Sequence, residues 1–427
     1  MKNILKGSFV VLIFKIFGAA SIFVTHIIIA REYGAEVLGA FNLILSLLMM
    51  ISIFSKIGLD VYVVRIIPSI VDHHEKVVTF IRKIFTLLLI GSLISTILYF
   101  CCIAWINEFL FKTTKAKGYL NSLIFIILPY TFFNVIAEIF RGFQNIFLYA
   151  FFLNFLQKIV LLVLLSCIIF LGITINPIYL MYCSIVFVFA VSLTTLYEFL
   201  SSRGYKLWAT ISENSGYTEK IFRHTWPMLL AGAIHYLMTN LDQLMIGYYL
   251  GEFSVGIYAA SVKISILLGF ILTSINGYIA PKISQAYECN DFIGIKKIYL
   301  NSIKIIAITV FPIVLPIILF PKFFLSLFGS EFVNYDLTLL IVNITFLVSA
   351  LFGPVGYILN MTDNQLILMK ILVCGILVNI ILNLTLIPIM GINGAAIATL
   401  VSVLIWKIFA ILFIKRRIFV KVSNAIA

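Results

Sequence analysis

Five ionisable side chains stand clearly inside long apolar segments, where a charge needs a partner or a function. They are Lys15, Lys158, Asp242, Lys263 and Lys407. An ionisable group at the centre of a membrane-spanning helix costs about 2.5–3.5 kcal/mol on insertion scales. The lysines could attract an anionic substrate, and Asp242 could bind a cation or a proton. Because lysines outnumber carboxylates here, we expect an anionic rather than a cationic substrate.

Further polar side chains share helix faces with these charges. Residues three or four apart, or a multiple of that spacing, lie on the same side of a helix. The stripes are Lys15 with His26, Asn154 with Lys158, and Tyr130 with Asn134, Glu138 and Arg141. A helix surface in contact with lipid would not carry such stripes, so we expect them to face water or one another.

The segment that contains Asp242 carries a further stripe. Gly232, His235 and Thr239 precede Asp242 at spacings of three or four residues. We therefore take Asp242, with His235, as the candidate site for a coupling cation or proton. A structural interpretation is also open, in which Asp242 pairs with a neighbouring lysine and the stripe holds the helices together.

The elements that position these side chains are membrane-spanning helices. Hydrophobic residues make up 63% of the chain and charged residues 11%, and the mean hydropathy is +1.15. Apolar stretches of about 18 residues or more recur without period-two alternation, which predicts an all-α integral membrane protein rather than a barrel. We expect twelve spans, at residues 8–29, 37–55, 84–106, 119–139, 148–171, 177–199, 226–249, 255–279, 299–320, 336–358, 366–387 and 393–414.

Several of these spans contain proline. The residues are Pro129, Pro312, Pro316 and Pro354. Proline has no backbone N–H, so it leaves a carbonyl of the preceding turn without its usual donor and bends or breaks a helix. We expect these four positions to bend their spans, either in a wall that flexes or lines a cavity or as static kinks.

The basic residues behind the net charge of +13 are distributed as a membrane topology requires. If both termini are cytoplasmic, most basic residues outside the spans lie on the cytoplasmic side. The exceptions are Arg31, Lys112, Lys115, Lys117 and Lys322. The positive-inside rule then predicts an even number of spans with both ends inside. The basic excess therefore gives no reason to expect a nucleic-acid partner.

The chain contains an internal repeat. Around Gly34 and again around Gly251, an apolar run ends at a glycine and a second glycine follows five residues later. An aromatic residue comes two residues after that, and a new apolar run begins. The two copies lie about half the chain apart. Related halves in a membrane protein are typical of transporters that work by alternating access.

The repeat divides the chain into two six-helix halves. We predict an N-terminal bundle at residues 1–205, a cytoplasmic linker at 206–224 and a C-terminal bundle at 225–427. Since one chain already holds both halves, we expect a monomer. Six spans in each half give the two repeats the same orientation in the membrane.

The sequence offers no catalytic, metal or cofactor site. The six cysteines include no Cys-x-x-Cys pair, so neither a disulfide framework nor a zinc site is indicated. No glycine-rich phosphate loop follows a strand, which excludes an ATP-driven pump. The predicted outer loops are short and carry no cluster of His, Asp or Glu.

These features resemble the multidrug/oligosaccharidyl-lipid/polysaccharide (MOP) flippase superfamily. The resemblance rests on twelve spans in two halves and on a Gly-x4-Gly-x-aromatic junction after the first span of each half. The segment from Gly58 through Asp60 to Arg65, after the second span, and Arg141-Gly142-Phe143, after the fourth, are similar to the polysaccharide-exporting branch. That branch includes the O-antigen flippases.

The resemblance implies a V-shaped bundle like that of MATE transporters, which opens alternately to the two sides of the membrane. The cargo would be an undecaprenyl-pyrophosphate-linked oligosaccharide, moved from the cytoplasmic to the periplasmic leaflet of a bacterial inner membrane. Lys15, Lys158, Lys263 and Lys407 would accompany the pyrophosphate. Proton or sodium coupling would run through Asp242.

The same resemblance implies the setting of the protein. It would be a step in lipopolysaccharide or O-antigen biosynthesis, with the lipid-linked oligosaccharide and membrane lipid as partners. A polysaccharide polymerase would act beside it. Two alternatives stay open: a cation-coupled small-molecule exporter of the same superfamily, and an integral-membrane polysaccharide polymerase or ligase. The enzyme would need a larger outer loop than this chain has.

Overall fold

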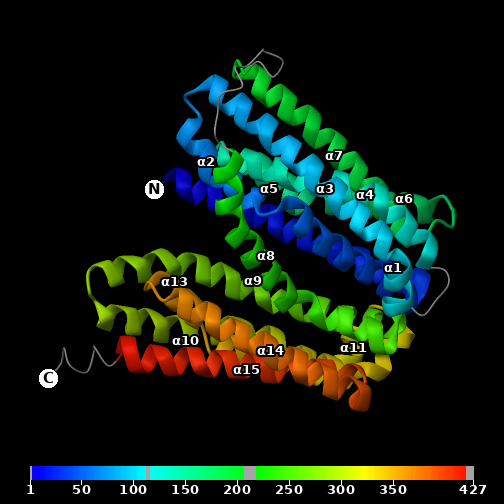
Figure 1. The fold of residues 1–427 in the computed structure, drawn as a ribbon. Helices are drawn as coiled ribbons and strands as arrows, with labels where there is room; N and C mark the ends of the chain where they lie inside the picture. The colour runs from blue at the N-terminus through cyan, green and yellow to red at the C-terminus, as the bar shows by residue number, and fades with distance from the viewer. Residues whose placement is uncertain (1, 112–115, 206–217, 420–427) are drawn as a thin grey trace. The chain divides into compact units, whose positions relative to one another are not determined.

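The computed structural model describes residues 2–111, 116–205 and 218–419, and these residues are almost entirely helical (Figure 1). No strand occurs in these three ranges. The elements are α1 Lys2–Lys56, α2 Leu59–Ile70, α3 His74–Leu110, α4 Ala116–Gly142, α5 Ile146–Ala150, η1 Phe151–Leu156, α6 Gln157–Phe170, α7 Pro177–Ser202, α8 Thr218–Leu250, α9 Glu252–Glu288, α10 Phe292–Leu319, α11 Pro321–Ser326, η2 Ser330–Tyr335, α12 Asp336–Leu351, α13 Val355–Met361, α14 Gln365–Met390, α15 Ile392–Ile414 and η3 Lys415–Phe419. The all-α prediction is confirmed.

All the predicted spans except the tenth lie, to within a residue at their ends, on continuous helical stretches. α1 contains the first two spans, which separate at Gly34, where φ is 84° and ψ is 174°. Among the described residues, nine helical stretches are long and apolar enough to cross a membrane. α8 and α9, which contain the predicted seventh and eighth spans, are not among the nine. The chain is therefore a multi-pass membrane protein, and the count of twelve crossings stays a prediction.

The four prolines differ in their place along the helices. α4 continues through Pro129, and α10 continues through Pro312 and Pro316. Only Pro354, of the four, stands at a helix break: α12 ends at Leu351 and α13 begins at Val355. The predicted tenth span at 336–358 is therefore wrong at its end. Gly353 adopts a left-handed φ of 65° just before Pro354, and the two together stop the helix.

Large apolar side chains are exposed along the outer faces of the helices. Phe125 is 78% exposed, Phe170 90%, Ile308 73% and Ile389 78%. A soluble protein would bury side chains of this size, but hydrocarbon surrounds them at no cost. Their exposure agrees with the membrane assignment.

The chain forms two compact units, each with its own core. The first comprises residues 1–32 and 40–240, and the second comprises residues 33–39 and 241–427. Of the predicted linker at 206–224, residues 206–217 lie outside the described part of the chain.

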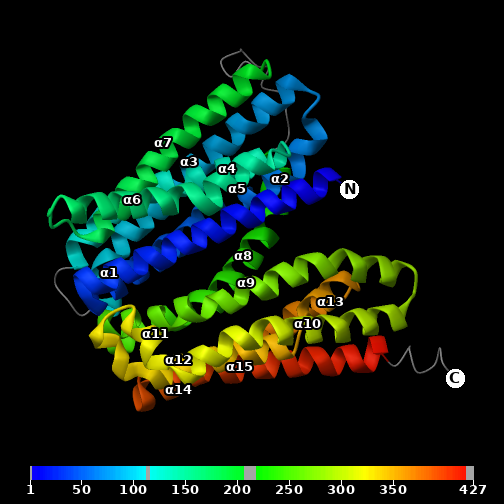
Figure 2. The same ribbon diagram turned by 180° about the vertical axis from the view of Figure 1, so that it is seen from behind.

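Each unit is built around one or two central helices. In the first unit, α4 packs against α2, α3 and α7, with Phe41, Phe140 and Phe152 fully buried. In the second unit, α15 packs against α12 and α14, and α9 packs against α10 and α12 (Figure 2). Phe328 and Phe332 are fully buried there.

The sequence repeat has a structural counterpart at its first glycine. Gly34 has φ 84° and ψ 174°, and Gly251 has φ 83° and ψ −175°. This combination is essentially restricted to glycine, because a Cβ would collide with the backbone. Both copies therefore use glycine to end one helix and redirect the chain into the next.

The second glycines of the two copies lie against each other within the second unit. A Cβ on Gly39 would overlap the carbonyl oxygen of Glu252 and lie 2.8 Å from the backbone N of Gly256. Reciprocally, a Cβ on Gly256 would overlap the carbonyl oxygen of Ala35 and lie 3.1 Å from the backbone N of Gly39. Glycine at both positions allows the backbones of the 33–39 segment and α9 to touch.

Candidate functional site

Asp242, on α8, is the acceptor at the centre of a polar cluster in the second unit. Its Oδ1 accepts hydrogen bonds from Nδ2 of Asn383 at 2.8 Å and of Asn379 at 3.2 Å. Its Oδ2 accepts from the hydroxyl of Tyr258 at 2.9 Å and from that of Thr399. The donors stand on α9, α14 and α15, so four helices meet at one carboxylate. We call these five residues the Asp242 cluster.

The donors to Asp242 are all neutral. Asp242 makes no ion pair with any lysine in the part of the chain that the structure describes. The structural interpretation therefore loses its lysine partner, whereas its other part, a stripe that holds helices together, agrees with the hydrogen bonds from α9, α14 and α15. Neutral donors bring no positive charge, so the site as a whole stays negative when Asp242 is ionised. The arrangement suits the binding of a proton or a monovalent cation.

A second oxygen of the cluster is also available. Asn383 is fully buried, and its Oδ1 has no hydrogen-bond donor among the described residues. Its amide nitrogen also donates to Oδ1 of Asn379 at 3.0 Å, and Nδ2 of Asn379 approaches Oγ1 of Thr399 at 3.3 Å. Carboxylate, amide and hydroxyl oxygens are the ligands that hard cations prefer. The residues present thus fit a small cation as well as a proton.

Sequence reasoning found Asp242 but missed its four donors. One signal was available: Asn379 and Asn383 stand one turn apart within the apolar run of α14. Tyr258 and Thr399 gave no comparable signal. His235 lies two turns before Asp242 on α8, and its side chain is outside the described part of the structure.

Lys407, on α15, has partners of its own. Its ammonium donates to the carbonyl oxygens of Ser349 and Gly353, both at 3.3 Å, and lies 4.6 Å from the ring centroid of Trp406. Only 6% of Lys407 is exposed. The carbonyl of Ser349 belongs to the last turn of α12, where helical donors run out, and that of Gly353 belongs to the break after it and also accepts from the backbone N of Val355 at 3.0 Å. The structure thus gives Lys407 backbone partners, and the contact of Lys407 with an anionic substrate stays a prediction.

The other three lysines are placed differently. Lys15 is exposed on α1 and Lys158 is half-buried at the start of α6, both in the first unit. The two ammonium groups lie close enough to repel each other. Neither makes an ion pair with a described residue. Lys263 is half-buried on α9, in the second unit, five residues after Tyr258.

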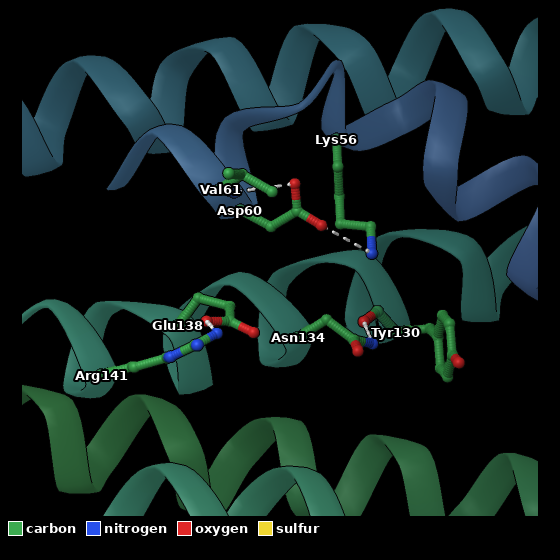
Figure 3. Close-up of polar contacts among 7 residues, drawn as sticks. All are labelled: Lys56, Asp60, Val61, Tyr130, Asn134, Glu138 and Arg141. Atoms are coloured by element: carbon green, nitrogen blue, oxygen red, sulfur yellow. Dashed lines mark hydrogen bonds and ion pairs between the residues drawn. The ribbon is translucent and has the colours of Figure 1, made fainter. Parts of the chain in front are cut away.

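The polar stripe on α4 is paired largely with itself. Figure 3 shows it along one side of α4, opposite the loop that joins α1 to α2. Arg141 lies 3.4 Å from Glu138, and Asn134 donates to the carbonyl oxygen of its own helix at Tyr130. Lys56, the last residue of α1, and Asp60, in the first turn of α2, form an ion pair at 3.3 Å on the facing segment, which Figure 3 also shows. These contacts indicate a structural role.

His26 also differs from the expectation. It is fully buried in the first unit, with Nδ1 2.7 Å from the carbonyl oxygen of Ile22 and Nε2 3.2 Å from Oδ1 of Asn42. Lys15 is exposed. The shared helix face therefore has two environments, because α1 is covered by neighbouring helices at one end of the stripe and not at the other.

Comparison with known families supports a transport fold. A family model described as "Polysaccharide biosynthesis protein" matches residues 4–287. A second, described as "MatE", matches residues 227–385, which include Asp242 and both of its asparagine donors.

Individual relatives agree with these matches. A protein of Haloferax volcanii described as "Probable flippase AglR" is 29% identical over 174 residues, which cover 40% of this chain and 37% of that protein. The matched stretch therefore spans little more than a third of this relative's length. It shows similarity of a segment, not equivalence of the whole proteins.

Two solved structures share the fold over nearly the whole chain. The inward-closed conformation of a protein described as lipid II flippase MurJ has a TM-score of 0.74 at 16% identity, covering 96% of this chain and 87% of that one. An inward-facing multidrug-resistance MATE transporter of the MOP superfamily has a TM-score of 0.76 at 17% identity, covering 94% and 95%. The predicted resemblance to this superfamily is confirmed at the level of fold.

Proposed function

We propose that this chain, which belongs to the polysaccharide biosynthesis protein family, moves a lipid-linked oligosaccharide across its membrane by alternating access. The cargo that we propose is an undecaprenyl-pyrophosphate-linked repeat unit such as that of an O-antigen. It passes from the cytoplasmic to the periplasmic leaflet. The duplicated architecture and the similarity to a probable flippase support this assignment.

One observation carries the proposal: Lys15 and Lys158 stand close together within apolar spans, with no carboxylate to neutralise them among the described residues. Holding two like charges together where the dielectric constant is low is costly. An anionic cargo removes that cost while it is bound. Lys263 would contribute further positive charge from the second unit, whereas Lys407 is held by backbone carbonyls and would contribute field but no contact.

The energy source that we propose is a cation gradient, and Asp242 would bind the coupling ion. An ionised Asp242 holds Tyr258, Thr399 and two asparagine amides as donors. A bound proton or sodium ion would compete with those donors, and would therefore loosen the contacts between α8 and the helices that carry them. This gives the second unit two states that differ in the occupancy of one carboxylate. His235 would add a second titratable group on the same helix.

The setting follows from the same premise. We place both termini in the cytoplasm of a bacterial cell, with the protein in the cytoplasmic membrane. Residues 1–205 and 225–427 would act as the two halves of a monomer, linked through 206–224. A polysaccharide polymerase would receive the flipped repeat unit.

The test is to delete the gene in its host and locate the lipid-linked oligosaccharide. Single repeat units trapped on the cytoplasmic leaflet are the result that we expect. Restoration by the intact gene, but not by a variant with Lys15 and Lys158 both changed to Gln, would tie the defect to the lysine pair. Units that reach the outer leaflet but stay unpolymerised would refute flipping and indicate an enzyme.

A cation-coupled exporter of small molecules is the second candidate. The match of the MatE model to residues 227–385, around Asp242, favours it. The same deletion strain distinguishes the two candidate functions. An unchanged lipid-linked pool together with a new sensitivity to toxic compounds would select the exporter.

A further inference from the structure

The helix Ile146–Phe170 departs from α-helical geometry at one place, where it meets the first span. Phe151–Leu156 form a π-helical turn between α5 and α6. A Cβ on Gly18 of α1 would overlap the carbonyl oxygen of Asn154, which belongs to this turn, and would lie 2.9 Å from its carbonyl carbon. Single π turns within α-helices occur frequently at functional sites.

Phenylalanines hold α1 against the π turn. The ring of Phe14 lies 5.3 Å from that of Phe147, 5.8 Å from that of Phe151 and 5.5 Å from that of Phe155, between centroids. Four residues are more than one turn of a regular α-helix, so side chains four apart point in slightly different directions. A π turn holds more residues per turn and compensates for this difference. Three rings at a spacing of four thus stay directed at Phe14. The residue after Phe14 is Lys15, so this packing also fixes its position.

The two helices carry three hydrogen-bond donors near this crossing, and no acceptor for them occurs among the residues that the structure describes. Nδ2 of Asn154 is buried and has no hydrogen-bond partner among the described residues. Lys158 follows one turn later, and its Cδ would lie 3.3 Å from a Cβ on Gly18, which is itself one turn from Lys15. A buried N–H that lacks an acceptor costs free energy, as does a pair of like charges in a spanning region. One anion between them would relieve both costs.

We propose that Asn154 is the third donor of an anion site that it forms with Lys15 and Lys158, and that this site takes the diphosphate of a lipid-linked sugar. The assignment rests on the proposed function and names the chemistry that the lysine pair selects. A sugar–diphosphate–lipid carries two negative charges, which two lysines balance. A sugar–monophosphate–lipid carries one, and would leave a positive charge uncompensated within the membrane. The amide N–H of Asn154 donates to a phosphoryl oxygen that the lysines do not reach.

The experiment is a binding titration with the full-length protein in nanodiscs of zwitterionic lipid. The probes are a short-chain prenyl diphosphate sugar, the matching monophosphate and inorganic pyrophosphate. The test variants are Asn154→Leu, which keeps the volume and removes the donor, and Lys158→Gln. Lys158→Arg keeps the charge and serves as rescue. Asn301→Leu and Lys304→Gln are matched controls, because both side chains are exposed on α10.

The wild-type protein should bind the lipid-linked diphosphate at least about tenfold more tightly than the monophosphate. Hydrogen bonds to charged groups contribute about 1.5–3 kcal/mol, so Asn154→Leu and Lys158→Gln should each weaken diphosphate binding roughly 10- to 100-fold. Lys158→Arg and both controls should bind as the wild type does.

Several results would overturn the inference. Asn154→Leu with wild-type affinity, or equal binding of monophosphate and diphosphate by the wild type, would refute it and leave the proposed function standing. Inorganic pyrophosphate binding as tightly as the lipid-linked sugar would refute the lipid assignment. A wild-type protein that binds none of the three probes would refute the inference and the proposed function together.

Discussion

Replacement of Gly39 by alanine tests the contact between the two copies of the glycine motif. The added Cβ would overlap the carbonyl oxygen of Glu252 and lie 2.6 Å from its carbonyl carbon. Two carbon atoms are in comfortable contact at about 3.5–4.0 Å. The obstacle is backbone rather than the end of a flexible side chain. The 33–39 segment and α9 must therefore separate by about 1 Å to accept the methyl group.

Overpacking of this kind costs about 1–3 kcal/mol. At roughly 2–4 °C per kcal/mol, the value for large domains, Gly39→Ala should melt about 2–12 °C below the wild type. Gly256→Ala should cost a similar amount, since its Cβ would lie 2.9 Å from the carbonyl carbon of Ala35. One separation of the two segments makes room for both methyl groups, so the double variant should lose less than the sum of the two single losses.

The assay is thermal unfolding followed by tryptophan fluorescence, on protein in detergent or nanodiscs. Gly356→Ala is the control: a Cβ there meets no atom within 4 Å, and the position is in helix α13, where alanine should be neutral or stabilising by up to about 1 kcal/mol. A melting temperature of Gly39→Ala equal to that of Gly356→Ala would refute the contact. Strictly additive losses at Gly39 and Gly256 would refute their reciprocity.

Other residues give further predictions. Asp242→Asn should leave cargo binding intact and abolish acceleration of transport by an imposed proton or sodium gradient in proteoliposomes; undiminished gradient dependence would exclude Asp242 from coupling. Lys407→Met should lower stability by about 1–3 kcal/mol, because the carbonyls of Ser349 and Gly353 lose a donor, and should leave cargo affinity unchanged. Weakened binding at normal stability would contradict this. Glu331 accepts from the backbone N of Ala35 at 3.1 Å, at the start of the helix that follows Gly34. Glu331→Gln should therefore destabilise by about 0.3–1 kcal/mol, an effect that high salt should erase.

The helices were predictable because each depends on a local property. A run of apolar residues of the required length predicts a span wherever it occurs, and the duplicated glycines marked the junctions at Gly34 and Gly251. The end of the tenth span was missed because Pro354 was read as a kink within one helix. Pro312 and Pro316 also stand in an apolar run, yet they lie within an unbroken helix. The left-handed glycine beside Pro354 decides the difference.

The candidate site was predictable only in part, because its chemistry depends on contacts between distant residues. Asp242 was conspicuous as a carboxylate in an apolar segment, yet its donors stand between 16 and 157 positions away along the chain. Lys407 had the same sequence signature as Lys15 and Lys158. Backbone carbonyls serve as its hydrogen-bond partners, and no residue type reports which carbonyls beside a helix break a lysine will reach.

The intramembrane charges therefore differ in how much they can do for a ligand. A charge with good partners must give them up before it binds anything else, so Lys407 gains little from a phosphate. Asp242 is an intermediate case. The hydroxyls of Tyr258 and Thr399 can rotate from donors to acceptors, so a cation could replace their hydrogen bonds to Asp242. Lys15 and Lys158 hold no partner among the described residues, and each gains the full interaction with an arriving anion. The proposed function therefore places cargo binding at the charges that the fold leaves unsatisfied, and coupling at Asp242, whose hydroxyl partners are able to turn.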